Sequence, residues 1–228
     1  LVMSGVTDCF QPIERKLKIT RQCLEVCQEF KNPVAIITKN HLVTRDIDIF
    51  KEMAKWNGCA VSISVTTLRR DLANVMEPRA SRPEDRLRTI RELSAAGIPV
   101  GVMVAPIIPA LTDEEVPALL KAVKDAGAQW AGYTVMRLPY AVKDLFVDWL
   151  TRNFPDRKDK IIHRIEALRG GKLNDSNFGS RMRGEGIFAE QIKALFLAGS
   201  KKIGFKNQWA SLDVSRFEKP GEKQLELF

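Results

Sequence analysis

The chain has 228 residues, of which 45% are hydrophobic and 28% charged, and 36 basic against 28 acidic side chains give a formal net charge of +8. This composition excludes a largely disordered chain, and the length fits one large domain. The longest apolar run, residues 98–111, contains prolines and is shorter than the ~20 apolar residues that a membrane-spanning helix needs. No secretory signal pattern opens the sequence. We therefore expect a cytoplasmic monomer without membrane association.

The excess of positive charge lies in the last third of the chain. Residues 1–150 have 20 basic and 18 acidic side chains, whereas residues 151–228 have 16 and 10. A basic surface attracts polyanions and raises their local concentration, and nucleic acids are the usual candidates. The distribution indicates a nucleic-acid partner, with ordinary solubility charge as the alternative.

Apolar runs alternate with amphipathic stretches through the first 138 residues. The predicted strands are 1–6, 34–38, 60–65, 100–104 and 130–135, and the predicted helices between them are 14–31, 46–57, 83–96 and 113–126. Gly97 and Gly127 close two of the helices, and Thr112 to Glu115 has the spacing of a capping box. Uniformly apolar strands are typical of parallel sheets covered on both faces. The pattern predicts an α/β fold with a partial parallel β/α (TIM-like) barrel; an open doubly wound sheet is the competitor.

Helices replace strands in the rest of the chain, at 139–153, 157–169 and 185–203. The loop between the last two, residues 170–186, is rich in glycine and polar residues. Its cations Arg181 and Arg183 are candidate nucleic-acid contacts, and a plain connector is the alternative. We divide the chain into a barrel at 1–138, a helical C-terminal extension at 139–215 and a flexible tail at 216–228.

The candidates for metal ligands are four cysteines, Cys9, Cys23, Cys27 and Cys59, and two histidines. Cys23 and Cys27 fall on a predicted helix, where we expect two small buried residues. A C-x3-C-x2-C loop would need a third cysteine where Phe30 stands. The histidines have no metal-binding spacing. We therefore expect no metal site in this chain, and no disulfide in a reducing compartment.

Polar residues follow the predicted strands, at the edge of a β/α barrel where active sites form. These strand ends are Thr7-Asp8, Lys39-Asn40, residues 64–67, Ala105-Pro106 and Met136-Arg137. Lys39 is a lone cation that closes a buried apolar run. A lysine in this position can hold a carboxylate or phosphate, or form a Schiff base.

Four stretches, in this order, resemble the radical S-adenosylmethionine (SAM) superfamily and, within it, the branch of spore photoproduct lyase. They are Val6-Thr7-Asp8, Ile37-Thr38-Lys39, Met76-Glu77-Pro78-Arg79 and AGIPVGVMVAPI at 96–107. The resemblance implies a partial β/α barrel whose first strand precedes a C-x3-C-x2-C loop with a [4Fe-4S] cluster. This chain lacks the loop and begins inside what resembles the second strand. We therefore expect an N-terminally incomplete sequence whose intact protein, and not this chain alone, binds the cluster; a naturally truncated protein without catalysis is the alternative.

The same resemblance implies that SAM is cleaved to a 5′-deoxyadenosyl radical and assigns residues to the binding of SAM. Lys39 would pair with the SAM carboxylate, and Thr7-Asp8 would lie near its methionyl or ribose part. Ser64 or Thr66 would reach the ribose, and Ala105 would offer backbone contacts to adenine. The sequence assigns no catalytic residue.

One position departs from the pattern of the lyases. They carry a cysteine hydrogen donor in a C-T-S-D stretch after this strand, where this chain has Gly5 in the donor's position and Cys9 four residues on. Radical chemistry on nucleic acid is the implied function, while lyase action on thymine dimers is in doubt. A Schiff-base aldolase that uses Lys39 and a noncatalytic DNA-associated adaptor are the alternatives.

The sequence ends in QLELF after a Pro, Gly and charged stretch at 219–223 that reads as a flexible tether. The pentapeptide is similar to the Q-L-x-L-F motif by which bacterial DNA-handling enzymes dock on the replication sliding clamp. In that mode Gln224 supplies amide hydrogen bonds, and Leu225, Leu227 and Phe228 fill an apolar cleft. The resemblance makes the clamp a candidate partner, and folding of the tail onto the barrel is the alternative.

Overall fold

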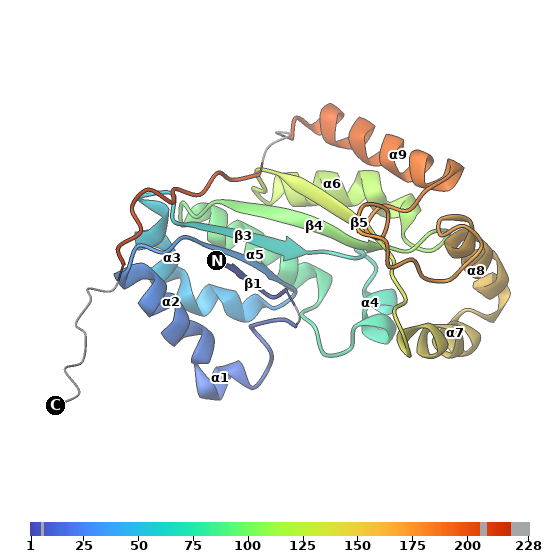
Figure 1. Ribbon diagram of the computed structural model, residues 1–228, viewed down its shortest axis with the longest axis horizontal. Coiled ribbons are helices and arrows are strands. Elements are labelled where there is room, and N and C mark those ends of the chain that lie inside the picture. Colours follow the sequence, from blue (N-terminus) through green and yellow to red (C-terminus); the bar gives the residue numbers. More distant parts are fainter. Residues whose placement is uncertain (6, 206–208, 220–228) are drawn as a thin grey trace.

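The computed structural model describes residues 1–5, 7–205 and 209–219. In these residues one parallel sheet has the strand order β1-β2-β3-β4-β5. The strands are β1 Val2–Met3, β2 Val34–Thr38, β3 Cys59–Ser64, β4 Val100–Ile107 and β5 Ala131–Val135. Each strand pairs with the next along the chain after a helical crossover (Figure 1). This arrangement confirms the predicted α/β fold and partial β/α barrel.

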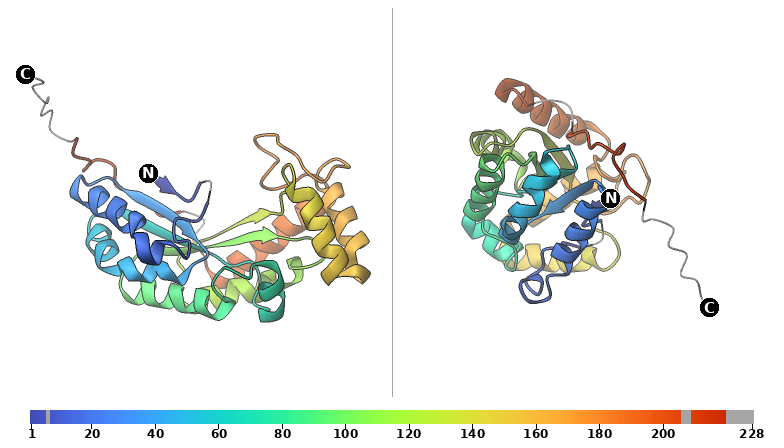
Figure 2. Two further views of the ribbon diagram at one scale, coloured as in Figure 1. Left: turned by 90° about the horizontal axis from the view of Figure 1, so that it is seen from below. Right: turned by 90° about the vertical axis from the view of Figure 1, so that its left-hand side faces the viewer.

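Helices cover one face of the sheet and leave the other, the open face, free of them, as the left view of Figure 2 shows. The helices of the barrel are α1 Glu14–Leu17, α2 Ile19–Glu29, α3 Ile47–Ala54, α4 Arg70–Met76, α5 Pro83–Ala95 and α6 Val116–Asp125. Short 3-10 helices are η1 His41–Asp46, η2 Asp113–Glu115 and η3 Pro155–Arg157. The predicted helix 14–31 is divided in two because Lys18 adopts a left-handed conformation, with φ 54°. Helix α4 was not predicted.

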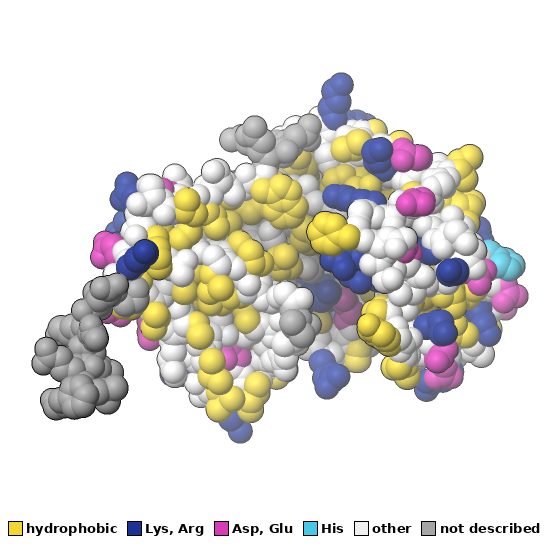
Figure 3. All heavy atoms as spheres, viewed as in Figure 1, with side chains coloured by type: hydrophobic (Ala, Val, Ile, Leu, Met, Phe, Trp, Pro, Cys, Tyr) yellow, Lys and Arg dark blue, Asp and Glu magenta, His cyan; other side chains and the backbone are white. Residues whose placement is uncertain are grey.

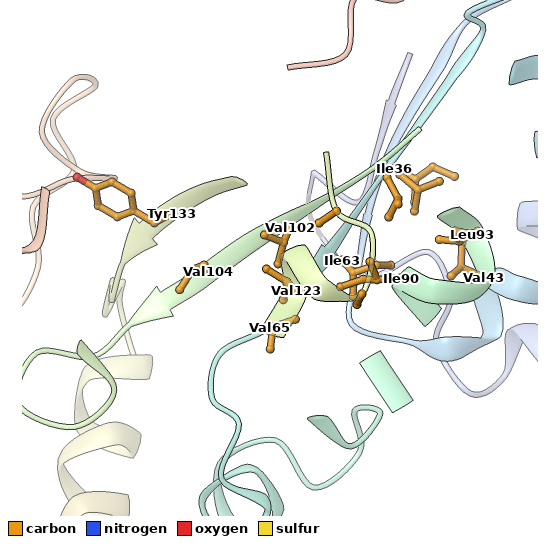
Figure 4. Packing of buried hydrophobic residues seen from close by; sticks show 14 of the residues in the cluster. Ile36, Val43, Ile63, Val65, Ile90, Leu93, Val102, Val104, Val123 and Tyr133 are labelled. Carbon is orange, nitrogen blue, oxygen red and sulfur yellow. The ribbon is translucent and has the colours of Figure 1, made fainter. Parts of the chain in front are cut away.

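The core lies between the sheet and the helices. Alternate residues of the central strands, among them Ile36, Ile63 and Val102, point toward Ile90 and Leu93 of α5 and are fully buried (Figure 4). Burial of each such side chain stabilises the fold by about 1.5–3 kcal/mol. The intervening strand residues face the open side, where the polar strand ends lie.

The predicted C-terminal extension forms two differently placed parts. Its helices are α7 Val142–Asn153, α8 Lys158–Ala167 and α9 Ile187–Ile203. Helices α7 and α8 pack on Leu72, Ile108 and Leu111 in a second apolar cluster. Helix α9 lies beside α6 (Figure 1), and the Phe196 ring is 4.6 Å from that of Tyr133 on β5.

Residues 209–219 run back across the N-terminal edge of the sheet. The backbone N–H of Asp213 donates to the carbonyl of Asn57, just before β3, at 3.0 Å. The N–H of Glu218 donates to the carbonyl of Phe30, before β2, at 2.9 Å. The first described residues of the predicted tail therefore lie against the barrel.

Several local details differ from the sequence-based expectations. Strand β1 is shorter than predicted. The capping box at Thr112 is not formed, because its hydroxyl accepts from the N–H of Ile108 at 2.8 Å instead. Cys23 is exposed, whereas Cys27 is buried as expected. The glycine stop at Gly97 is confirmed by its left-handed φ of 77°.

Among the described residues, no helix is long and apolar enough to cross a membrane.

Candidate functional site

The carboxylate of Asp8 joins the loop after β1 to the end of β2. The Thr38 hydroxyl lies 2.8 and 2.9 Å from its two oxygens, and the backbone N–H of Lys39 donates to it at 2.8 Å. The N–H of Phe10 donates at 2.9 Å from within the loop itself. Because hydrogen bonds to a carboxylate fix its position, Asp8 holds the loop beside Lys39.

An ion-pair cluster connects the ends of β2 and β3. The Lys39 ammonium lies 3.5 Å from one oxygen of Glu77, which follows α4, and the Arg86 guanidinium lies 2.6 Å from the other. Arg86 reaches from α5 and also donates to the carbonyls of Ser81 and Ser64, at 2.8 and 3.1 Å. Its side chain is 2% exposed, whereas that of Lys39 is 32% exposed. Arg86 is therefore a buried anchor for Glu77, and Lys39 is the member that a ligand can reach.

The hydroxyl of Thr66 extends this cluster to β4. It lies 3.0 Å from the carbonyl of Ala105 and 3.3 Å from the carboxylate of Glu77. Ser64 is two residues earlier on β3 and therefore shares the open face with Thr66. Both side chains are almost fully buried. Four of the six residues predicted to bind SAM thus lie at or near adjoining strand ends, namely Lys39, Ser64, Thr66 and Ala105. Thr7 and Asp8 lie in the loop after β1.

A cavity of about 380 Å³ opens next to this cluster. It is lined by Thr7, Asp8, Phe10, Gln11, Pro12, Lys39, Asn40, Arg79 and Ala80. The molecular surface is hollowed between the barrel and the C-terminal helices, and basic side chains gather there (Figure 3). The site therefore combines a cation, a fixed carboxylate and hydroxyl groups beside a space for a ligand.

This donor set fits the SAM molecule better than it fits an iron-sulfur cluster. Lys39 suits a carboxylate, and the carbonyl of Ala105 and the hydroxyl of Thr66 suit hydrogen-bonding groups of an adenosine. In the described part of the chain, no three His, Cys, Asp or Glu side chains come together as a metal-binding group. Cys9 lies near the site, and burial raises the pKa of its thiol.

The predicted nucleic-acid contacts lie in the loop before α9. The Arg183 guanidinium lies over the Tyr133 ring at 3.8 Å, and that of Arg181 over Phe178 at 5.0 Å. The loop lies against β5, the last strand of the sheet, where the N–H of Val135 donates to the Met182 carbonyl at 2.9 Å. The predicted clamp-binding residues Gln224, Leu225, Leu227 and Phe228 lie outside the described residues.

Sequence reasoning gave no role to Glu77, Arg86 or Thr38. Glu77 belongs to the Glu-Pro stretch that carries the family resemblance, and this was a usable signal. Arg86 reads as one polar residue among several on an amphipathic helix. Only the packing of α5 under β3 shows that its side chain is buried.

A model of the Radical SAM superfamily matches residues 1–123, which is more than half of the chain. The chain therefore belongs to the radical SAM superfamily. An uncharacterized protein from Mycobacterium tuberculosis is 30% identical over 152 residues, 66% of this chain and 45% of that protein. Another from Methanocaldococcus jannaschii is 33% identical over 115 residues, 50% of this chain and 43% of that protein. The chain spans less than half the length of these relatives.

Two solved structures share the fold. A spore photoproduct lyase mutant with bound AdoMet and dinucleoside spore photoproduct has a TM-score of 0.64 and 15% identity, over 89% of this chain and 58% of that one. A second spore photoproduct lyase mutant has a TM-score of 0.61 and 16% identity, over 84% and 55%. At these identities the likeness concerns the fold.

Proposed function

We propose that this protein is a radical SAM enzyme that binds SAM at the carboxyl ends of β1 to β4 and acts on nucleic acid. The observation that carries the proposal is the hydrogen-bonded cluster of Asp8, Lys39, Glu77, Thr66 and Ala105 beside a cavity, in a chain of this superfamily. No feature of the described residues favours the Schiff-base aldolase or the noncatalytic adaptor.

The residues of the cluster have separate tasks in this proposal. Lys39 pairs with the SAM carboxylate, and Glu77 and Asp8 hold its side chain and backbone in place. Ser64 or Thr66 binds the ribose, and the backbone at Ala105 binds adenine. A [4Fe-4S] cluster, which membership of this superfamily implies, would supply the one electron for the reductive cleavage of SAM.

The nucleic-acid part of the proposal is supported by two features of the chain. The last third is basic, and two arginines of the loop before α9 lie over aromatic rings, Arg183 over Tyr133 of β5 and Arg181 over Phe178 of the loop itself. Arginine recognises phosphate, and arginine and aromatic side chains both stack on bases. The structural neighbour with a bound dinucleoside has the same fold.

The test of SAM binding uses Lys39→Ala, with Lys55→Ala as the matched control. Lys55→Ala removes the same charge, but from an exposed ion pair with Glu52 at the opposite edge of the sheet. A charge-assisted hydrogen bond contributes about 1.5–3 kcal/mol, so Lys39→Ala should weaken SAM binding about tenfold or more in anaerobic equilibrium dialysis. Unchanged affinity in a folded Lys39→Ala variant would reject the assignment.

A further inference from the structure

Two arginines meet at the carboxyl end of β5, on the same edge of the sheet as Lys39. Arg137 follows β5, and Arg169 follows α8 with a side chain that is almost fully buried. Arg169 donates to the carbonyls of Met136 and Ser180 at 2.9 and 3.1 Å. Arg137 has one weak contact, with the sulfur of Met182 at 3.7 Å. The two guanidinium groups are therefore held in place by neutral atoms.

Their hydrogen-bonding capacity is incompletely used. The Nε atoms of both Arg137 and Arg169 are buried and have no hydrogen-bond partner among the described residues. Neither arginine forms an ion pair with a described carboxylate within 4.0 Å. Arg86, in contrast, pairs with Glu77 at 2.6 Å. Arg169 is almost fully buried, and a buried cation without an anion is unfavourable, while Arg137 is half-buried and within reach of a ligand. The pair at β5 therefore has the character of an anion-binding site.

The surrounding charges support this description. Burial lowers the pKa of Arg169, and the nearby positive charge of Arg137 lowers it further, while Asp175 acts in the opposite direction. The Asp175 carboxylate is already bound by the Ser180 hydroxyl and by the N–H of Asn177 at 2.8 Å. The carboxylate that acts on Arg169 is thus already hydrogen-bonded to neutral groups, and Lys172 also acts on it.

The anion that fits here is separate from the carboxylate of SAM. Strands in a sheet lie about 4.8 Å apart, so the end of β5 is about 14 Å from the end of β2, where Lys39 lies. Guanidinium groups match the geometry of phosphate oxygens. We infer that Arg137 and Arg169 form a subsite for a backbone phosphate of a single-stranded nucleic acid. This inference rests on the proposed function and names the group that places the strand near the SAM site.

The experiment measures binding of a short fluorescein-labelled single-stranded DNA by fluorescence anisotropy, over a series of salt concentrations. Arg137→Gln removes the cation and leaves the two hydrogen bonds of Arg169. Arg91→Gln is the control, because Arg91 is exposed on α5 and the change in net charge is the same. Arg137→Lys retains the charge without the planar group. Circular dichroism checks that each variant is folded.

We expect Arg137→Gln to weaken binding about tenfold and to reduce the slope of log K against log salt by about 0.7, the value for one phosphate of a single strand. The DNA affinity of Arg137→Lys should lie between those of Arg137→Gln and the wild type. Arg91→Gln should bind DNA like the wild type. Equal binding by Arg137→Gln and Arg91→Gln would overturn the subsite and leave the proposed function intact.

Two further outcomes distinguish a strand phosphate from free phosphate, and failure of the subsite from failure of the proposed function. Inorganic phosphate binding that Arg137→Gln abolishes, together with DNA binding that Arg137→Gln leaves unchanged, would indicate a free-phosphate site and would overturn the assignment to a strand. A wild-type chain that binds SAM through Lys39 but no DNA would refute the subsite together with the nucleic-acid part of the proposed function, while SAM binding would stand.

Discussion

Removal of the Arg86 side chain tests whether the buried ion pair holds the site together. In Arg86→Met, the carboxylate of Glu77 loses its partner at 2.6 Å, and the carbonyls of Ser64 and Ser81 each lose a donor. Breaking a buried pair by deletion of one partner is destabilising by about 3–5 kcal/mol. The Glu77 carboxylate would keep only the longer pair with Lys39 at 3.5 Å, so the loss should lie at the lower end of this range. We expect a loss of this size in the free energy of unfolding, measured by urea denaturation with circular dichroism.

Arg88→Met is the matched control for this change. Arg88 lies on the same helix, is 52% exposed and pairs with Asp85 and Glu92 at the surface. Exposed pairs contribute about 0–1 kcal/mol, so this variant should be nearly as stable as the wild type. The double variant Arg86→Met with Glu77→Gln should recover about 1–3 kcal/mol of the sum of the single losses, since the carboxylate that loses its Arg86 partner is no longer charged. Equal losses for Arg86→Met and Arg88→Met would refute the reasoning.

Three further predictions concern the core, the thiols and the tail. An ideal Cβ on Gly101 would clash with the Trp130 ring, so Gly101→Ala should be destabilising by about 1–3 kcal/mol in urea denaturation. A Cβ on Gly179 would meet nothing within 4 Å, so the control Gly179→Ala should be destabilising by less than about 0.5 kcal/mol. Similar losses for the two variants would contradict this reasoning. Burial raises the pKa of the Cys59 thiol from 9.0 to about 12, so its contribution to stability is complete below pH 9 and is lost as the pH rises toward 12. Between pH 8 and 10 the free energy of unfolding of Cys59→Ala should therefore fall by about 1.4 kcal/mol less than that of the wild type, and an equal fall would exclude this linkage. For the tail, we propose docking to the replication sliding clamp: a pull-down with purified clamp should retain the full chain and lose a variant without residues 224–228, and equal retention of both would refute the docking.

The fold was predictable because its strands are uniformly apolar and its crossovers are regular. The bounds of β2 agree with the prediction, and Gly97 ends α5 by the left-handed conformation that glycine permits. The errors arise where tertiary contacts override local signals. The hydroxyl of Thr112 binds an upstream N–H and so cannot cap η2, and the left-handed Lys18 interrupts an otherwise helical pattern.

The candidate site was predictable in its location but only partly in its members. Parallel strands place all their carboxyl ends at one edge, and this brought Asp8, Lys39 and Thr66 into consideration. The roles of Glu77 and Arg86 depend on how α4 and α5 pack under β3. Such a contact between a helix and a strand end leaves no regular spacing in the sequence.

The open face of the sheet differs between its two edges. Toward the N-terminal edge, glycines at 101 and 132 leave room for indole rings, and Trp130 and Trp209 occupy that space with centroids 6.5 Å apart. Residues 209–219 then cross the same edge. Toward the carboxyl edge, the strands end in the hydroxyl groups of Ser64 and Thr66. A ligand that enters the open face therefore meets aromatic packing at one edge and the polar cluster around Lys39 at the other.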